Sequence, residues 1–263
     1  MLKKLLKYDL ANIYKFLIIF YILAIFFASL TRIFFQFENS VILNIIAQIC
    51  SGTTISMMCS IIINNLMRLW VKFKENFYGD ESYLTHTLPI TKKTLYQSKI
   101  ITAILTTITS FLVIAFTLFV AYYSKENIDS LKNLLTPIAN LYDSKVSSFI
   151  IIILVILALE IINIIQLGFT GIILGHRKNQ NKTVYSVIYG FLIYLITQTI
   201  TLIIIFIISL FNKDMMNLFV TKSPVDLTLL KTIMYLASLI YGGTIILIYF
   251  INTKLFNKGV NVE

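Results

Sequence analysis

Long apolar stretches alternate with short polar ones along the chain, and the apolar stretches show no period-two alternation. Each apolar stretch is about 20 residues or longer, the length that an α-helix needs to cross ~30 Å of hydrocarbon. A transmembrane β-barrel would instead show alternation in segments of roughly ten residues. The pattern predicts an all-α membrane protein with six spans, near residues 16–35, 41–67, 100–123, 147–174, 184–211 and 231–252.

The first fifteen residues differ from the spans because they are amphipathic. Apolar residues recur at helical spacing, and lysines fall largely on the other side: Leu2, Leu5, Leu6, Leu10 and Ile13 against Lys3, Lys4, Lys7 and Lys15. A basic amphipathic helix of this kind lies in the headgroup layer. We expect residues 1–15 to form such an elbow helix, leading directly into the first span.

The polar segments between the spans are too short for a soluble domain. The segments 124–146 and 212–231 are mixed in charge and contain Pro137 and Pro224, and small interfacial helices are expected in them. The segment 68–99 is the longest polar stretch near the amino terminus. The sequence therefore predicts a single transmembrane domain over residues 1–263.

Composition supports the membrane assignment, and charge gives the orientation. The chain is 58% hydrophobic and only 13% charged, with a mean hydropathy of +0.85, whereas soluble domains average about 45–50% apolar and about 25% charged residues. Of the 22 Lys and Arg residues, 15 fall in the segments on the amino-terminal side of the membrane. Cytoplasmic loops are enriched in these residues. Both termini are therefore expected in the cytoplasm of a cell carrying this protein in its plasma membrane, and the net charge of +10 needs no nucleic-acid partner.

The sequence offers no candidate catalytic residues. No glycine begins a G-x-x-x-x-G-K-[ST] phosphate-binding loop, so ATP hydrolysis is not expected in this chain. His86 and His176 lack neighbouring Cys, Asp or Glu residues at metal-ligand spacing. We expect neither an enzyme nor a chain with a metal or cofactor of its own.

The segment 68–99 is rich in aromatic residues, including Trp70, Phe73, Phe77 and Tyr83. Exposing so many aromatics to water is unfavourable, so two interpretations are open. The segment lies at headgroup depth, where aromatic residues gather, or it forms a short helix that docks into a groove on a cytoplasmic partner. In the second case Phe77→Asp is expected to uncouple the partner without unfolding the chain.

A specific resemblance is carried by Tyr78–Pro89, which reads YGDESYLTHTLP, with Ser98-Lys99 after it and Leu5–Leu10 (LLKYDL) at the start. These residues resemble the permease subunits of ABC-2 type exporters of low-GC Gram-positive bacteria. Members usually carry Gly where this chain has Ser82. The six-span layout agrees over the whole chain, although only Tyr78–Pro89 is specific.

The resemblance implies a dimeric permease, completed by a second copy or a related chain, with two separate ATPase subunits that bind ATP and Mg. The cargo would be an antimicrobial peptide, a peptide toxin or another amphipathic or hydrophobic compound. The segment between spans two and three would be the coupling helix, ended by Gly79. The residues assigned to ATPase docking are Phe73, Phe77, Tyr78, Gly79, Asp80, Glu81, Tyr83 and Leu84.

Polar residues inside the spans form a second group of candidates. Glu160 is the only acidic residue in a span interior, and Asn163, Leu167 and Thr170 share its helical face, with Gln166 near the edge. A carboxylate at mid-span costs roughly 2.5–3.5 kcal/mol and should face protein or water. Either a structural cluster between helices or a polar lining of the transport path explains this group. The same two explanations hold for a polar face of the second span: Thr53, Ser56, Ser60 and Asn64.

Two functional hypotheses follow. The first is the membrane-spanning subunit of an ATP-driven exporter. The second is a non-transporting sensor, scaffold or assembly factor that binds a cytoplasmic partner through the same segment. The small-xxx-small pattern Gly171–Gly175 predicts in both cases that two helices approach closely.

Overall fold

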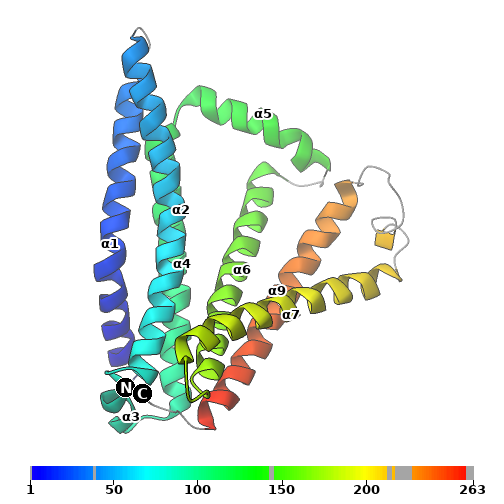
Figure 1. Ribbon diagram of the computed structural model, residues 1–263. Coiled ribbons are helices and arrows are strands. Elements are labelled where there is room, and N and C mark those ends of the chain that lie inside the picture. Colours follow the sequence, from blue (N-terminus) through cyan, green and yellow to red (C-terminus); the bar gives the residue numbers. More distant parts are fainter. Residues whose placement is uncertain (1, 38–39, 142–144, 212–214, 217–226, 259–263) are drawn as a thin grey trace. The chain divides into compact units, whose positions relative to one another are not determined.

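The computed structural model describes residues 2–37, 40–141, 145–211, 215–216 and 227–258, and the long elements in these ranges are helices. Six helices are long and apolar enough to cross a membrane (Figure 1). They confirm the predicted all-α, multi-pass class. The helices are α1 (Leu2–Phe35), α2 (Val41–Tyr78), α3 (Ser82–Thr87), α4 (Lys92–Tyr122), α5 (Lys125–Leu141), α6 (Val146–Gly175), α7 (Lys182–Ser209) and α9 (Leu227–Asn257).

The three largest differences from the expected helix boundaries are in α1, α2 and α4. The predicted elbow at 1–15 and the first span form one continuous helix, α1, which contains no glycine or proline to interrupt it. Helix α2 continues past residue 67 to Tyr78, with Gly79 directly after its last residue. Helix α4 begins at Lys92, eight residues before the predicted span, because Thr91 caps it by accepting a hydrogen bond from the backbone amide of Thr94 at 3.3 Å.

The chain divides into two compact units. Unit 1 comprises Met1–Asn76 and Asp80–Ser130, and unit 2 comprises Phe77–Gly79 and Leu131–Glu263. The first three spans thus belong to unit 1, apart from the last two residues of α2. The last three spans belong to unit 2.

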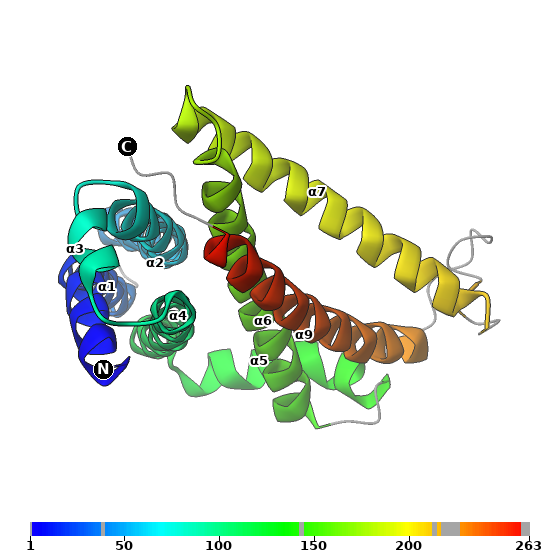
Figure 2. The ribbon, with the colours of Figure 1, turned by 90° about the horizontal axis from the view of Figure 1, so that it is seen from below.

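Unit 1 is held together by hydroxyl pairs between helices. Helix α1 packs along α4, and α2 runs beside them (Figures 1 and 2). Four side-chain pairs join the three helices: Tyr14–Thr109 at 2.9 Å, Tyr21–Ser110 at 2.9 Å, Thr31–Thr54 at 3.1 Å and Ser51–Tyr122 at 2.7 Å. Each such bond contributes around 0.6–1 kcal/mol in a membrane. Together they fix how α1, α2 and α4 face one another.

Unit 2 is built on a close crossing of α6 and α7. Helices α7 and α9 each pack against α6 along part of its length, and α7 runs away from α6 beyond the crossing (Figures 1 and 2). A Cβ atom added to Gly171 would lie 2.6 Å from the Ser186 carbonyl oxygen and 2.7 Å from Gly190 Cα. One added to Gly175 would overlap Ser186. The Gly171–Gly175 pair therefore lets the two backbones touch, as the spacing predicted.

Gly171→Ala is expected to lower the free energy of unfolding by about 1–3 kcal/mol, because the added methyl group meets backbone atoms that cannot turn aside. Gly190→Ala is the matched control, since its Cβ would meet only Gly171 Cα, at 3.9 Å. That change should be neutral or slightly stabilising, because alanine favours a helix over glycine. The measurement is the midpoint of thermal unfolding in detergent micelles. Equal midpoints for the two variants would contradict the crossing.

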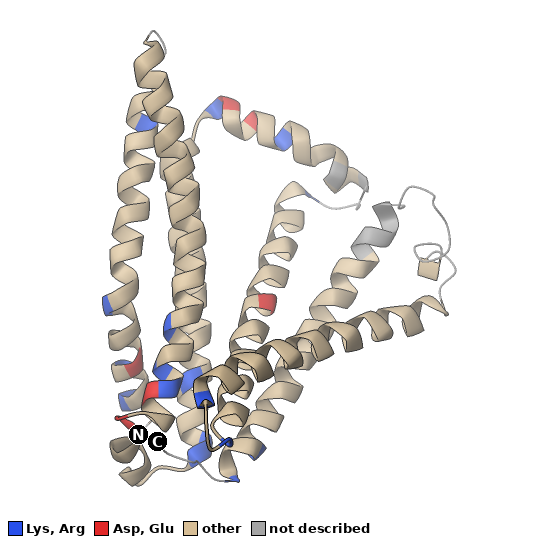
Figure 3. Ribbon diagram, viewed as in Figure 1, with Lys and Arg blue, Asp and Glu red and all other residues tan. Residues whose placement is uncertain are grey.

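Helix α5 occupies the segment 124–146, where an interfacial helix was expected. It is amphipathic, and its charged residues lie in the first half (Figure 3). Pro137 lies inside the helix. The matching prediction for residues 212–231 falls largely outside the described residues.

Basic residues gather at one end of each unit (Figure 3). In unit 1 this end holds the start of α1, the end of α2 and the start of α4. In unit 2 it holds the turn between α6 and α7, with Arg177, Lys178 and Lys182, and the end of α9, with Lys254. Within each unit, the segments that the charge count assigned to one side of the membrane thus lie together.

Candidate functional site

The site is built around α3, a single short helix between α2 and α4. Gly79 separates α3 from α2. After α3, Leu88 adopts an extended backbone (φ −63°, ψ 137°), the conformation favoured before a proline, here Pro89. The segment 79–91 therefore forms a compact bridge, with α3 at its middle, rather than the long loop expected for 68–99.

A buried ion pair joins α1 to α4 beside this bridge. The Lys99 ammonium lies 2.6 Å from Asp9 Oδ1, and the Ser98 hydroxyl donates to Asp9 Oδ2 at 2.8 Å. The two charged side chains are only 11% and 14% exposed. Burial lowers the pKa of Lys99, and the charge of Asp9 and its hydrogen bond oppose that shift. Both carboxylate oxygens of Asp9 therefore have a partner, which a buried ion pair needs if it is to be stable.

A second ion pair ties α3 to α2. The Lys72 ammonium lies 2.6 Å from Glu75 and 3.0 Å from Glu81, which immediately precedes α3. Burial lowers the pKa of Lys72, but the hydrogen bonds and charges of the two carboxylates outweigh it, so the pKa is raised overall. Glu81, assigned to docking from the sequence, thus also holds the start of α3 in place. One turn earlier on α2, Arg68 donates to Asn12 Oδ1 at 2.8 Å.

The aromatic residues assigned to docking are mostly buried within the chain. Phe73 is fully buried in unit 1, edge-on to Tyr96 at a centroid distance of 6.3 Å. Phe77 is fully buried in unit 2, edge-on to Phe256 of α9 at 4.7 Å. Tyr78 is 2% exposed. The expectation that Phe77→Asp leaves the fold intact is therefore replaced, because Phe77 packs inside the protein.

Tyr78 stacks on a histidine that sequence reasoning left without a role. Its ring centroid lies 4.3 Å from that of His176, which follows α6 and is fully buried. His176 Nδ1 lies 2.9 Å from the Ile172 carbonyl oxygen. Burial raises the pKa of the Tyr78 hydroxyl, and the nearby Arg177 charge opposes this. Tyr78 and His176 are far apart in the sequence, and no sequence pattern predicted that they are in contact.

The side chains of the site that face outward are on and beside α3. Tyr83 is 72% exposed and Leu84 is 74% exposed, and Leu88 and Asp80 are exposed as well. Ser82, in contrast, is fully buried. Of the residues assigned to docking, Tyr83, Leu84 and Asp80 are the ones available to another molecule. Phe73, Phe77 and Tyr78 are buried instead, and Glu81 is ion-paired to Lys72.

The polar residues of α6 divide into a half-buried and a buried set. Glu160 is partly exposed, whereas Asn163, Gln166 and Thr170 are at most 4% exposed. Asn252 of α9 donates to the Gln166 carbonyl oxygen at 3.2 Å. Leu167 is buried among them. Of the predicted group, Gln166 is thus shown to meet α9, and its partner Asn252 was not among the candidates.

The predicted polar face of α2 makes no hydrogen bond to another helix among the described residues. Thr53 and Asn64 donate to carbonyl oxygens of their own helix, at Ile49 and Ser60, and Ser56 is exposed. The bonds to α1 and α4 come from Thr54 and Ser51 instead. The sequence of α2 alone did not predict which of its faces contacts α1 and α4.

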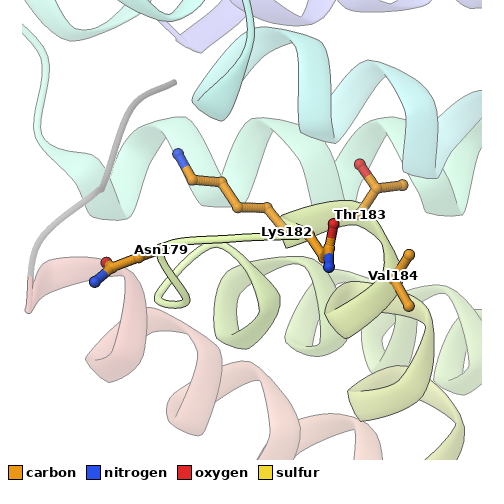
Figure 4. A pocket seen from close by; sticks show the side chains of 5 residues that line it. Asn179, Lys182, Thr183 and Val184 are labelled. Atoms are coloured by element: carbon orange, nitrogen blue, oxygen red, sulfur yellow. The ribbon is translucent and has the colours of Figure 1, made fainter.

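A pocket of about 420 Å³ lies at the turn between α6 and α7 (Figure 4). It is lined by Asn179, Asn181, Lys182, Thr183 and Val184. Asn181 has a left-handed backbone (φ 51°), which asparagine tolerates better than most residues. The lining comes from this one turn and the first residues of α7. The pocket is therefore a feature of the turn, separate from the polar residues of the spans.

Comparison of the chain with models of protein families, with curated proteins and with solved structures gave no match.

Proposed function

We propose that this chain is the membrane-spanning permease subunit of an ATP-driven exporter, and that a separate ATPase subunit docks on α3. Two ATPase subunits, carrying ATP and Mg, and a second permease half would complete the transporter. Both termini and α3 would face the cytoplasm of the cell, with the membrane being the plasma membrane. The observation that carries the proposal is the exposure of Tyr83 and Leu84 on a helix whose preceding residue, Glu81, is ion-paired to Lys72.

The outward face of α3 has the chemistry of a docking surface. An aromatic and an aliphatic side chain stand side by side, both more than 70% exposed, and Asp80 lies at the edge of the same bridge. Apolar anchors bordered by polar groups are what protein interfaces use for most of their binding energy. The basic end of unit 1, where α3 lies, is the end expected in the cytoplasm. A cytoplasmic protein therefore fits this surface better than lipid tails do.

Residues from the stretches that resemble ABC-2 permeases make ion pairs in unit 1. The resemblance rests on three separate stretches of the chain. Leu5–Leu10 contributes Asp9, Tyr78–Pro89 contributes Glu81, and the third stretch is Ser98 with Lys99. Asp9 binds Ser98 and Lys99 directly, and Glu81 pairs with Lys72 nearby. A rigidly held α3 is what transmission of force from an ATPase to the spans would require. A flexible linker between two spans would not need these ion pairs.

Leu84→Asp is expected to abolish co-purification of the ATPase while leaving the permease folded, because an aspartate disrupts an apolar anchor without entering the core. Leu134→Asp on α5 is the matched control, since Leu134 is 73% exposed and Leu84 is 74% exposed. The measurement is the amount of ATPase recovered with the tagged chain in mild detergent. Equal recovery with both variants would reject α3 as the docking site.

The alternative function is a non-transporting sensor, scaffold or assembly factor that uses the same surface. It would show the same dependence on Leu84, but the protein recovered would not be a P-loop ATPase. The identity of the recovered partner therefore separates the two functions. The cargo is proposed only as a class, amphipathic or hydrophobic peptides, because the spans are lined by aliphatic and aromatic residues.

A further inference from the structure

The described part of unit 2 concentrates positive charge at one end (Figure 3). Five residues, here called the basic cluster, lie in the turn between α6 and α7 and at the end of α9: Arg177, Lys178, Lys182, Lys254 and Lys258. Glu160 is the only acidic residue in the described part of unit 2. It lies about 22 Å along α6 from Gly175, the last residue of that helix. Glu160 is therefore too far away to neutralise the basic cluster.

Contacts with neutral groups hold the basic cluster together. The Arg177 guanidinium donates a hydrogen bond to the Leu255 carbonyl oxygen of α9 at 3.0 Å, which keeps the end of α9 beside the turn. The Lys178 ammonium lies 5.7 Å from the centroid of the Tyr185 ring in α7. Within the described ranges, no residue of the basic cluster makes an ion pair. Its positive charge is therefore not balanced within the described part of unit 2.

The pocket of about 420 Å³ at this turn has one residue of the basic cluster, Lys182, in its lining. The Lys182 side chain extends from the first turn of α7 (Figure 4). The other polar residues of the lining are Asn179, Asn181 and Thr183. Ammonium and amide groups donate hydrogen bonds, so the pocket suits an anion with several acceptor oxygens. A phosphate group has this chemistry, and lysine is a common partner of phosphate in proteins.

The pocket also borders an exposed apolar face of α7. Val184, which lines the pocket, is 57% exposed, and Val187, Ile188 and Phe191 are exposed as well. These residues follow Val184 by three, four and seven positions and so share one face of the helix. Both α6 and α7 are long and apolar enough to span a membrane, so the turn between them lies where the chain leaves the hydrocarbon. This position favours a lipid over a soluble phosphate compound or an acidic protein, because only a lipid has acyl chains to cover the apolar face.

We propose that the pocket and the basic cluster bind the phosphate headgroup of an anionic phospholipid. Lys178 and Lys182 pair with the phosphate, and the amides of Asn179 and Asn181 donate to the oxygens of the headgroup. The acyl chains lie along the apolar face of α7 that begins at Val184. Basic residues beside a span also set its orientation, but that role requires neither a pocket nor a preference for one headgroup. The proposal does not depend on the exporter function.

The test is native mass spectrometry of the full chain in mild detergent, with no ATPase present. The protein is titrated with phosphatidylglycerol, and separately with phosphatidylcholine that has the same acyl chains. The Kd of the first bound lipid is measured in each titration. The wild type is expected to bind phosphatidylglycerol roughly tenfold more tightly, because it carries a net negative charge and phosphatidylcholine does not. Equal affinity for the two lipids would overturn the proposal.

Lys182→Gln is expected to weaken phosphatidylglycerol binding about fivefold and to leave phosphatidylcholine binding unchanged. Fivefold corresponds to the loss of about 1 kcal/mol for one basic residue near a membrane surface. Lys92→Gln is the matched control. Lys92 is the first residue of α4, as Lys182 is of α7, and both are partly exposed, but Lys92 lies outside the pocket. Equal phosphatidylglycerol affinity of folded Lys182→Gln and Lys92→Gln would overturn the site.

Lys178→Gln decides the question if Lys182→Gln does not fold, since Lys178 is exposed. Unchanged phosphatidylglycerol affinity in Lys178→Gln would then overturn the proposal. Inorganic phosphate, added at the same concentration as the lipid, distinguishes a lipid site from a phosphate site. It is expected not to displace phosphatidylglycerol, because it has no acyl chains to contact α7. Displacement would overturn the assignment of a lipid as the occupant.

Discussion

Phe77→Asp is expected to abolish the folded protein, with essentially no monodisperse material recovered after extraction in mild detergent. Phe77 is fully buried and packs edge-on against Phe256 at 4.7 Å. Loss of a buried phenylalanine costs about 3–5 kcal/mol, and an unpaired carboxylate in its place adds several more. Since total stability is of order 5–15 kcal/mol, the change exceeds what the fold can absorb. Size-exclusion chromatography of the extracted variant measures the outcome.

Tyr83→Asp is the control for this result, because it makes the same kind of change six residues later. Tyr83 is 72% exposed, and substitution at an exposed position usually alters stability by at most about 0.5 kcal/mol. Normal recovery of Phe77→Asp would mean that the end of α2 does not pack against α9. Loss of both variants would mean that α3 is itself buried.

Lys99→Met is expected to lower the free energy of unfolding by about 3–5 kcal/mol, because it leaves the Asp9 carboxylate buried without its cation. Asp9→Leu is expected to lower the free energy of unfolding by a similar amount, because it leaves the Lys99 ammonium buried without its anion. The double variant should recover most of the loss, since two apolar side chains of similar volume can replace a buried pair almost without penalty. Thermal unfolding of the four proteins gives the coupling between the two positions.

Lys93→Met is the control for the loss of one lysine. Lys93 lies on the same helix but is exposed, so its unfolding midpoint should match that of the wild type. Additive losses in the double variant would contradict the 2.6 Å ion pair.

The fold class was predictable because the hydrocarbon layer imposes a length and a composition on every span. Helix ends were less predictable, since charged residues such as Lys72 and Lys74 do not stop a helix and Thr91 starts one well before the apolar stretch. The continuity of α1 was likewise hidden by a change from amphipathic to apolar character that does not interrupt a helix. The Gly171–Gly175 spacing did predict a close approach, but α7 could not be identified as the partner.

The candidate site could be predicted only in part, because the burial of a side chain depends on residues far away in the sequence. The sequence singled out the right segment, but aromatic residues that pack and aromatic residues that face outward look alike without their neighbours. Phe77 and Tyr83 differ in burial because of Phe256 and the direction of α3, neither of which is local. Glu160 stood out because a carboxylate inside a span is rare, whereas the hydrogen bond from Asn252 to the Gln166 carbonyl oxygen depends on the fold.

The measurement that tests the exporter assignment most directly is purification of the tagged wild-type chain from its native membrane in mild detergent. The co-purifying proteins are then identified and quantified. The assignment predicts a P-loop ATPase in near-equal amount, whose recovery is lost in Leu84→Asp and kept in Leu134→Asp. A folded chain that is recovered alone, or with a protein that has no phosphate-binding loop, would contradict it and favour the sensor or scaffold function.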